Sequence, residues 1–384
     1  MSRLRVIAAS ISLLVVLFST PGSGQAEESG AAGSQEGAAF AMTNVTADNR
    51  IVTYRRAADG ALTRVGSVST RGKGIGTDLD TQGGLRLSAD HRFLYAVNAG
   101  SDDVTVFSVN GPNLTFVQKV PAGDQPNSLT IHGDLLYVLN GSVAGNGIRG
   151  FRVAPNGKLT PLPNSFRLLS SPIAVPGQVE FSPDGRVLLV THKTTNVLLS
   201  PEDAIDAFTV GTNGLPSATP RRNASHGLRP FSLAFRNDGS LVVVESFNAA
   251  PSKSAASSYR LSADGRLTVV DGSVRNRQTD TCWVVITGDG RYAFTANFGN
   301  GTISSYRFGS DEDLRLINGS AASLGAMSQP VDLALSADSQ FLYLLLRGTG
   351  GVAAFRIEDG SLHPLGVVTG GLPVADGASG LAAY

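Results

Sequence analysis

The chain has 384 residues, of which 45 are glycine and only 16% are charged, and its 31 basic and 31 acidic side chains give a formal net charge of +0. This balance gives no reason to expect a nucleic-acid partner, which would require a basic surface. The single cysteine, Cys282, excludes an intrachain disulfide, so stability must come from burial of apolar side chains.

The first 26 residues have the pattern of a secretory signal. Arg3 and Arg5 form a basic start, residues 6–18 an apolar core, and residues 24–26 (GQA) a small-residue cleavage site. The apolar run is short for a bilayer span, so we expect export to a secreted or periplasmic location and no membrane attachment after cleavage. Residues 27–39 are small, polar and glycine-rich, which predicts a disordered lead-in.

Three short apolar segments follow, at residues 40–44 (FAMTN), 51–55 (IVTYR) and 62–68 (LTRVGSV). They are typical of the later strands of a four-stranded antiparallel unit. No candidate for the first strand of that unit precedes them.

The complete unit is clearest at residues 284–308, VVITGDGRYAFTANFGNGTISSYRF. Its Asp-Gly and Asn-Gly pairs supply the positive φ angles that tight hairpins require, so they predict three antiparallel strands. The pattern recurs about every 50 residues, which is typical of propeller blades. Its inner strands are expected to start near Leu85, Leu129, Val179, Leu233, Val284, Leu333 and Leu381.

The last of these starts is followed by only one strand before the chain ends. We therefore expect the strand at Leu381 to complete the N-terminal blade, which closes a ring of seven blades and removes its open edges. The predicted fold is an all-β, seven-bladed β-propeller over residues 40–384, and a monomer is expected.

Basic residues crowd the loops expected at the mouth of the central channel, where propellers usually bind ligands. They are Arg221, Arg222, His226, Arg229, Arg275 and Arg277. Converging guanidinium groups would suit a carboxylate or phosphate, and so predict a small anionic ligand. The alternative is a set of solvated charges with Asp280 and Glu202 as local partners.

Glu245 and His192 each end an apolar run, at residues 241–244 and 187–190. A carboxylate at such a position would act as a general base if burial raised its pKa, whereas the alternative is a simple buried pair. The five histidines lack metal-ligand spacing, and neither a G-x-S-x-G elbow nor a P-loop occurs, so no metal or cofactor is expected.

Segments such as SPDGRVLLVT (182–191) and SADGRLTVV (262–270) make residues 40–384 resemble the lactonase-type seven-bladed propeller family. That family includes propeller-type 6-phosphogluconolactonases, carboxymuconate-lactonising enzymes and secreted relatives with YVTN-type repeats. The resemblance implies a small lactone or muconate substrate, handled at the channel mouth without a metal by a His, two Arg and a Glu.

Counted from the turn glycine of each blade, the family's four positions hold other residues here. They are Gly177 for the His, Phe231 and Phe298 for the two Arg, and Phe247 for the Glu. Arg229 and Glu245 keep the family's Arg-to-Glu separation but are displaced by two residues, about 6 to 7 Å along a strand.

Three functions remain open from the sequence. A lactonase or lactonising enzyme would use Arg229, Glu245 and His192 as catalytic residues. Its ligand-binding residues would be Arg277, His226, Arg275, Gln178 and Phe298. The alternatives are a non-catalytic propeller that binds an anionic small molecule or glycan, and a platform for a protein partner.

Overall fold

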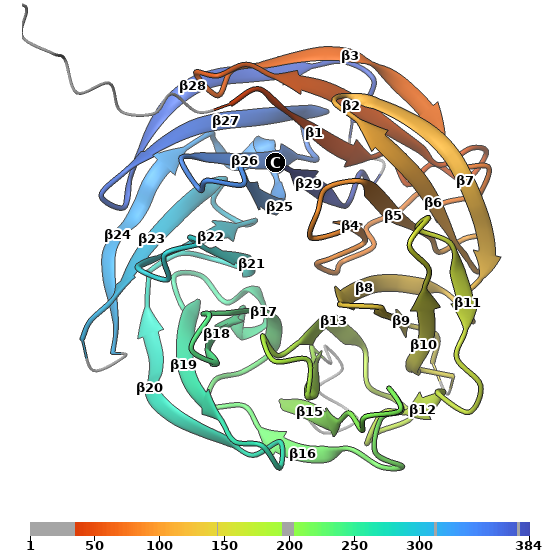
Figure 1. The fold of residues 1–384 in the computed structure, drawn as a ribbon. Coiled ribbons are helices and arrows are strands. Elements are labelled where there is room, and N and C mark those ends of the chain that lie inside the picture. Colours follow the sequence, from red (N-terminus) through yellow and green to blue (C-terminus); the bar gives the residue numbers. More distant parts are fainter. Residues whose placement is uncertain (1–34, 144, 194–202, 311–312, 375–376) are drawn as a thin grey trace, which may run out of the picture. The chain divides into compact units, whose positions relative to one another are not determined.

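The strands form seven antiparallel sheets around a central channel, which confirms the predicted all-β, seven-bladed propeller (Figure 1). The structure is a computed structural model that describes residues 35–384 except 144, 194–202, 311–312 and 375–376. The predicted signal segment and most of the predicted lead-in therefore lie outside the described residues.

Each blade has four strands from the channel outward, and the blade that starts with β8 has a fifth short one. The strands follow sequence order in every blade except the closing one, where β29 precedes β1, β2 and β3. The innermost strands are β4 (Leu85–Leu87), β8 (Pro126–His132), β13 (Pro176–Phe181), β17 (Pro230–Phe235), β21 (Thr281–Ile286), β25 (Pro330–Leu335) and β29 (Leu381–Ala383). The second strands are β1 (Gly37–Met42), β5 (Phe93–Asn98), β9 (Leu135–Asn140), β14 (Val187–His192), β18 (Ser240–Glu245), β22 (Tyr292–Asn297) and β26 (Phe341–Leu346).

The third and outermost strands complete the same blades. The third strands are β2 (Arg50–Arg56), β6 (Asp103–Asn110), β10 (Gly147–Val153), β15 (Ala204–Thr209), β19 (Ala255–Leu261), β23 (Thr302–Phe308) and β27 (Gly351–Glu358). The outermost strands are β3 (Leu62–Ser69), β7 (Asn113–Pro121), β11 (Leu159–Pro161) with β12 (Arg167–Leu168), β16 (Arg221–Ala224), β20 (Leu267–Arg275), β24 (Leu314–Ser323) and β28 (Ser361–Thr369).

The described helical segments are the 3-10 turns η2 (Phe247–Ala249) and η3 (Ala326–Ser328). In the described part of the chain, no helix has the length and apolar character needed to cross a membrane.

Local turn chemistry explains why the strands begin where they do. Gly290 has φ of 70°, which a glycine adopts at low cost. Asp289 accepts hydrogen bonds from the hydroxyl of Thr287 at 2.6 Å and from the backbone N–H of Arg291 at 3.0 Å. These bonds close the turn directly before β22, as the repeat predicts.

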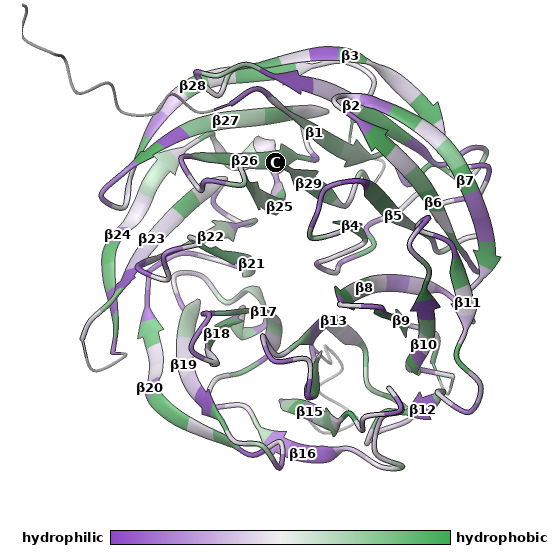
Figure 2. Cartoon of the chain, viewed as in Figure 1, coloured by the Kyte–Doolittle hydropathy of each residue, from purple (hydrophilic) through white to green (hydrophobic). Residues whose placement is uncertain are grey.

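The core lies between neighbouring blades, because each sheet is covered on both faces. All six residues of β14 and of β18 are buried, which explains their nearly continuous apolar sequences. Figure 2 shows the same apolar character along β1 and β27, whereas the outermost strand β16 is polar.

The strand β29 pairs with β1 and closes the ring, as predicted. Phe40 lies opposite Ala382, and the backbone N–H of Tyr384 donates to the carbonyl of Ala38 at 3.0 Å. The strand β1 starts at Gly37, three residues before the start predicted from the sequence. The earlier start follows from the two-sided pairing, since small buried residues at 37–39 fit between β2 and β29.

Asp332 of β25 also holds the closing strand. Its carboxylate accepts a hydrogen bond from the backbone N–H of Gly380 at 2.6 Å, directly before β29. Only 2% of Asp332 is exposed, and burial raises the pKa of its carboxyl group to about 7, although the N–H groups of Gly380 and Gly83 and the charge of Arg86 oppose the rise. The folded chain therefore keeps the proton on the Asp332 carboxyl group up to a higher pH than the unfolded chain does.

Four blades share a buried side-chain pair that we call the blade clasp. It joins the last residue of the second strand to the third residue of the third strand, and all eight side chains are fully buried. The pairs are Asn98 with Thr105 at 2.9 Å, His192 with Asp206 at 3.0 Å, Glu245 with Ser257, and Asn297 with Ser304 at 2.9 Å. Such diagonal neighbours on one face of a sheet can contact directly, so the clasp ties the two strands together.

The raised pKa of Asp332 predicts a pH-dependent stability. Because the folded-state pKa lies above the unfolded value of 3.8, the folded chain binds more protons between these values, and its stability should fall as the pH rises through this window. The expected slope is up to about 1.4 kcal/mol per pH unit. Asp332→Asn should lack this contribution. Urea unfolding of both proteins from about pH 4 to pH 8 measures it, and a stability difference independent of pH would contradict the assignment.

The blade clasp predicts coupling between His192 and Asp206. His192→Asn or Asp206→Ser alone should each lower the free energy of unfolding by about 1–3 kcal/mol, because one buried polar group loses its partner. The double variant copies the pair of Asn297 and Ser304, so it should lose less than the sum of the two. A double-mutant cycle by urea unfolding tests this, and strictly additive losses would argue against a structural pair.

Candidate functional site

A segment of the loop between β3 and β4, residues 77–83, lies across one mouth of the channel. We call it the mouth segment. The N–H of Gln82 donates to the carbonyl of Gly177 in β13 at 3.1 Å, and its side-chain amide exchanges two hydrogen bonds of 2.9 Å with the backbone of Val284 in β21. Trp283 donates through Nε1 to the carbonyl of Thr81 at 3.0 Å. The mouth segment leads into β4, whereas β13 and β21 belong to the two blades on either side of the β17 blade, across the channel from β4, so the segment spans the channel (Figure 1).

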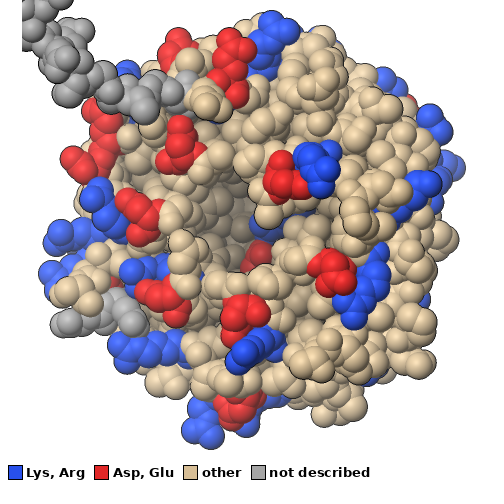
Figure 3. Space-filling model, in the orientation of Figure 1, with Lys and Arg blue, Asp and Glu red and all other residues tan. Residues whose placement is uncertain are grey.

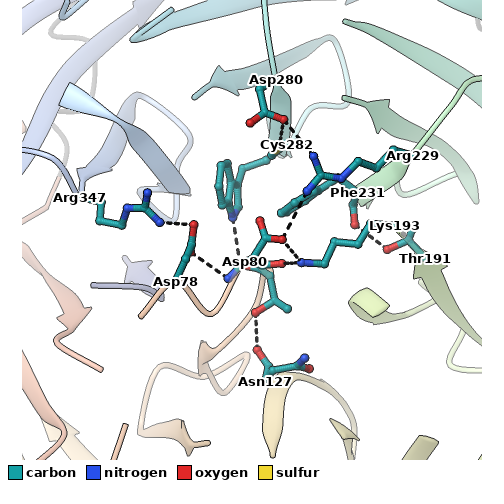
Figure 4. Close-up of polar contacts among 12 residues, drawn as sticks. Asp78, Asp80, Asn127, Thr191, Lys193, Arg229, Phe231, Asp280, Cys282 and Arg347 are labelled. Atoms are coloured by element: carbon teal, nitrogen blue, oxygen red, sulfur yellow. Dashed lines mark hydrogen bonds and ion pairs between the residues drawn. The ribbon is translucent and has the colours of Figure 1, made fainter. Parts of the chain in front are cut away.

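Three basic and three acidic side chains form one network of contacts at this mouth (Figure 4). Its members are Lys193, Arg229 and Arg347, with Asp78, Asp80 and Asp280. Two of the carboxylates, Asp78 and Asp80, belong to the mouth segment. The basic side chains are only 2% to 12% exposed, whereas Asp78 and Asp80 are 30% and 35% exposed, so these two carboxylates lie on the solvent side of the cations.

Arg229 precedes β17 and is weakly held by its acidic neighbours. Its guanidinium lies 3.5 Å from Asp80 and 3.5 Å from Asp280, beyond the usual range of a strong hydrogen bond. Its buried Nε has no hydrogen-bond partner among the residues that the structure describes. This guanidinium therefore retains capacity for a further anionic group.

Lys193 follows directly after β14 and reaches under the mouth segment. Its ammonium contacts both the carboxylate and the backbone carbonyl of Asp80, and it lies 4.8 Å from the ring centroid of Phe231. A buried ammonium needs such partners, because its desolvation is costly.

Arg347 follows β26 and completes the cationic group. It pairs with Asp78 and lies 3.4 Å from the side-chain oxygen of Gln329. Its guanidinium stacks over Phe298 at 4.6 Å, and its buried Nε has no hydrogen-bond partner within the described part of the chain. Each arginine of the mouth therefore has one N–H donor without a hydrogen-bond partner among the described residues.

Asp280 precedes β21 and is the least exposed of the three acids in the network. Burial raises the pKa of its carboxyl group, and the neighbouring charge of Arg229 opposes the rise. The thiol of Cys282 donates to Asp280 at 3.3 Å, and burial raises the pKa of that thiol well above its usual range. Cys282 is therefore held as a thiol rather than as a nucleophilic thiolate.

The chain enters four inner strands through a residue with positive φ. These residues are Gln125, Arg229, Asp280 and Gln329, with φ between 46° and 56°. Each accepts a hydrogen bond at its carbonyl from an N–H just beyond the second strand of the same blade, at 2.9 to 3.2 Å. Such left-handed conformations cost on the order of 1–3 kcal/mol each and collect at functional sites, and two of the four residues belong to the charged network.

The two other residues predicted to be catalytic lie inside their blades. Glu245 and His192 are members of the blade clasp, and neither contacts the charged network among the described residues. Glu245 accepts from the hydroxyl of Ser273 at 2.6 Å, and burial raises the pKa of its carboxyl group against the effect of its hydrogen-bond donors. His226 lies 3.1 Å from the same hydroxyl, so Ser273 connects it to Glu245.

The predicted convergence of basic loops at the mouth is wrong for most of its members. Arg221 and Arg222 belong to β16 and Arg275 ends β20, so all three lie on outermost strands. The strand boundaries predicted from the sequence left these residues in loops, because the polar, exposed strands that carry them have no apolar pattern. Arg275 instead stacks over Phe247 at 3.9 Å, and Arg277 is exposed beyond the end of β20.

Of the remaining predicted ligand-binding residues, Phe298 lies at the mouth under Arg347. Gln178 lies in β13, where its amide bridges Glu180 at 2.8 Å and the N–H of Leu233 at 2.9 Å. Both ends of that amide are therefore used within the protein. The predicted pairing of Asp280 with the basic loops is confirmed for Arg229, whereas Glu202 lies outside the described residues.

Four residues of the charged network were missed by sequence reasoning: Lys193, Arg347, Asp78 and Asp80. The loops that carry them were predicted to lie at the mouth, and Lys193 and Arg347 directly follow second strands. Their position directly after a second strand was therefore enough to predict that these two cations lie at the mouth. Nothing in the sequence around Asp78 and Asp80 indicated that their segment crosses the channel.

The charges around the central hollow are mixed in sign on the face drawn in Figure 3, where acidic and basic side chains lie next to one another. On this face no single-sign patch dominates. The anion-binding capacity described above therefore resides in a local group of cations rather than in the surface as a whole.

Comparisons with known proteins agree with this architecture. The model of the family described as "Lactonase, 7-bladed beta-propeller" matches residues 34–175. Among curated proteins, the comparison finds no match.

Several solved structures share the fold at low sequence identity. A candidate 6-phosphogluconolactonase of Bacteroides fragilis aligns with a TM-score of 0.70 at 18% identity, covering 91% of this chain and 98% of its own. One of Bacteroides uniformis gives 0.71 at 16%, covering 91% and 100%. A periplasmic gluconolactonase of Pseudomonas aeruginosa gives 0.65 at 17%, covering 90% and 99%. Together with the family match and the seven blades, these structures confirm the resemblance inferred from the repeats: this chain has the fold of the lactonase-type seven-bladed β-propellers.

Proposed function

We propose that this chain is an exported, metal-independent lactonase-type protein that binds a small carboxylated lactone, or the hydroxy acid it opens to, at the mouth formed around Arg229. The observation that carries the proposal is the group of three cations held together at this mouth. The protein's own Asp78 and Asp80 occupy these cations, so a carboxylate is the chemical group that the arrangement accepts.

Opening of a lactone requires a proton acceptor for the attacking water and a stabilised oxyanion. Asp280 takes a proton from water while the water oxygen attacks the acyl carbon. Arg229 stabilises the negative charge that develops on the carbonyl oxygen. When the ring C–O bond breaks, Asp280 returns the proton to the departing alkoxide. The raised pKa of Asp280 and its 3.5 Å contact with Arg229 support this assignment over Glu245 or His192, which are used inside their blades.

Export is part of the same proposal. Its support is the secretory pattern of residues 1–26, together with the structural likeness to a periplasmic gluconolactonase of Pseudomonas aeruginosa. A non-catalytic role, in which the mouth only binds an anionic small molecule, is the second candidate. It is favoured by the displacement of Glu245 and His192 from the mouth.

Arg229→Ala tests the function at the central residue. A panel of sugar lactones and carboxymuconolactones is first assayed with the wild-type protein to find a substrate. For that substrate, loss of the guanidinium should lower kcat/KM by roughly 100-fold, because the group that stabilises the oxyanion is lost. Arg307→Ala removes an exposed arginine of β23 and serves as the matched control, with no expected change. Arg277→Ala tests the second arginine predicted from the sequence.

Asp280→Asn separates catalysis from binding. It should abolish turnover while retaining binding of the product hydroxy acid, measured by calorimetry. Turnover that survives Arg229→Ala unchanged would refute the residue assignment. Binding without turnover of any compound by the wild-type protein would select the non-catalytic candidate.

A further inference from the structure

The mouth segment blocks the site that the proposed function assigns to a ligand. Asp80 contacts Lys193 and lies 3.5 Å from Arg229, and Asp78 pairs with Arg347. A ligand carboxylate that approaches from solvent meets these two carboxylates before it reaches any of the three cations, because the cations are far less exposed than Asp78 and Asp80.

Most of the mouth segment is firmly anchored through its backbone. The carbonyl of Thr77 accepts from Asn44 at 2.7 Å, and that of Gly83 accepts from the N–H of Leu129 at 2.8 Å. Gln82 is held at both ends of its side chain, and Leu79 is 6% exposed and packs in a core cluster. Movement of the whole segment would break these contacts.

The carboxylates of Asp78 and Asp80 are held differently. Apart from the N–H of Asp80, which donates to Asp78 at 2.9 Å, their described contacts are ion pairs with the three cations. Asp78 and Asp80 are 30% and 35% exposed, so solvent can receive both carboxylates when they turn away. The buried cations that they leave would be uncompensated at a large cost, whereas a ligand carboxylate that takes their place restores the pairing. Rotation of the two side chains with such an exchange therefore costs less than displacement of the backbone, which would break the contacts described above.

These observations point to a gate made of two side chains. We infer that Asp78 and Asp80 are an internal competitor for the ligand: they occupy the cations in the empty protein and turn away when a ligand carboxylate takes their place. The inference rests on the proposed binding site. It predicts that the protein binds its ligand more weakly than the cations alone would allow, because only the open fraction of molecules is competent.

Removal of either competing carboxylate should strengthen binding. Asp80→Asn and Asp78→Asn should each tighten the binding of D-gluconate, a hydroxy acid that serves as the probe, by about tenfold, measured by isothermal titration calorimetry. Asp264→Asn is the matched control, because Asp264 is an ion-paired aspartate on an exposed turn, 2.9 Å from Arg221 and away from the mouth. Its affinity for D-gluconate should equal that of the wild type.

The single tryptophan supplies a second readout. Trp283 donates to the carbonyl of Thr81, next to Asp80, so opening of the gate should change its emission during a titration of the wild-type protein with D-gluconate. The change should saturate at the dissociation constant measured by calorimetry. In Asp80→Asn the starting emission should already be closer to the ligand-bound value.

The outcomes separate this inference from the proposed function. Equal affinity of D-gluconate for the wild type and both Asn variants, with unchanged Trp283 emission, would overturn the gate and leave the binding site standing. Binding to none of the proteins would overturn both. If Asp80→Asn fails to fold because buried Lys193 loses its partner, Asp78→Asn carries the test, since Arg347 there keeps its contact with Gln329.

Discussion

The pairing of β29 with β1 is the constraint on which the rest of this structure depends. It joins the two ends of the described chain into one sheet and closes seven blades around a single channel. A closed ring leaves no blade at an open end, and every loop that enters an innermost strand is directed toward the same axis. Charged residues from five separate loops can meet at one mouth because the ring holds those loops in place.

Equivalent positions in the blades carry different chemistry for a physical reason. The end of each second strand is buried between its neighbours, so a polar side chain there must find a partner inside the blade. Asn98, Asn297 and Glu245 meet this need with hydroxyl partners, and His192 meets it with the carboxylate of Asp206. One residue further on, the chain leaves the sheet at the channel mouth, where Lys193 and Arg347 belong to the charged network. A displacement of one residue therefore separates a place inside the blade from a place in the charged network.

The mouth combines strain, incomplete pairing and partial exposure. Arg229 and Asp280 have left-handed backbones, and the buried Nε atoms of Arg229 and Arg347 have no hydrogen-bond partner in the segments that the structure describes. An ordinary structural ion-pair cluster would be expected to satisfy these groups. The proposed function and the gate give one explanation for the incomplete pairing and the partial exposure. A site for an external carboxylate needs hydrogen-bond donors that the protein itself does not use, and its cations are covered by Asp78 and Asp80 until the ligand binds.

Apart from polar outermost strands such as β16, the strands, the turns, the number of blades and the closure of the ring could be predicted from the sequence. They follow from Asp-Gly and Asn-Gly turns, from apolar runs such as residues 241–244, and from the recurrence of both about every 50 residues. Which charges share the mouth could not be predicted. Gln82 and Val284 are 202 residues apart in sequence, and Asp80 and Arg229 are 149 apart, so no local pattern connects them. The path of the mouth segment depends on these long-range contacts, which require several blades to be arranged around one channel.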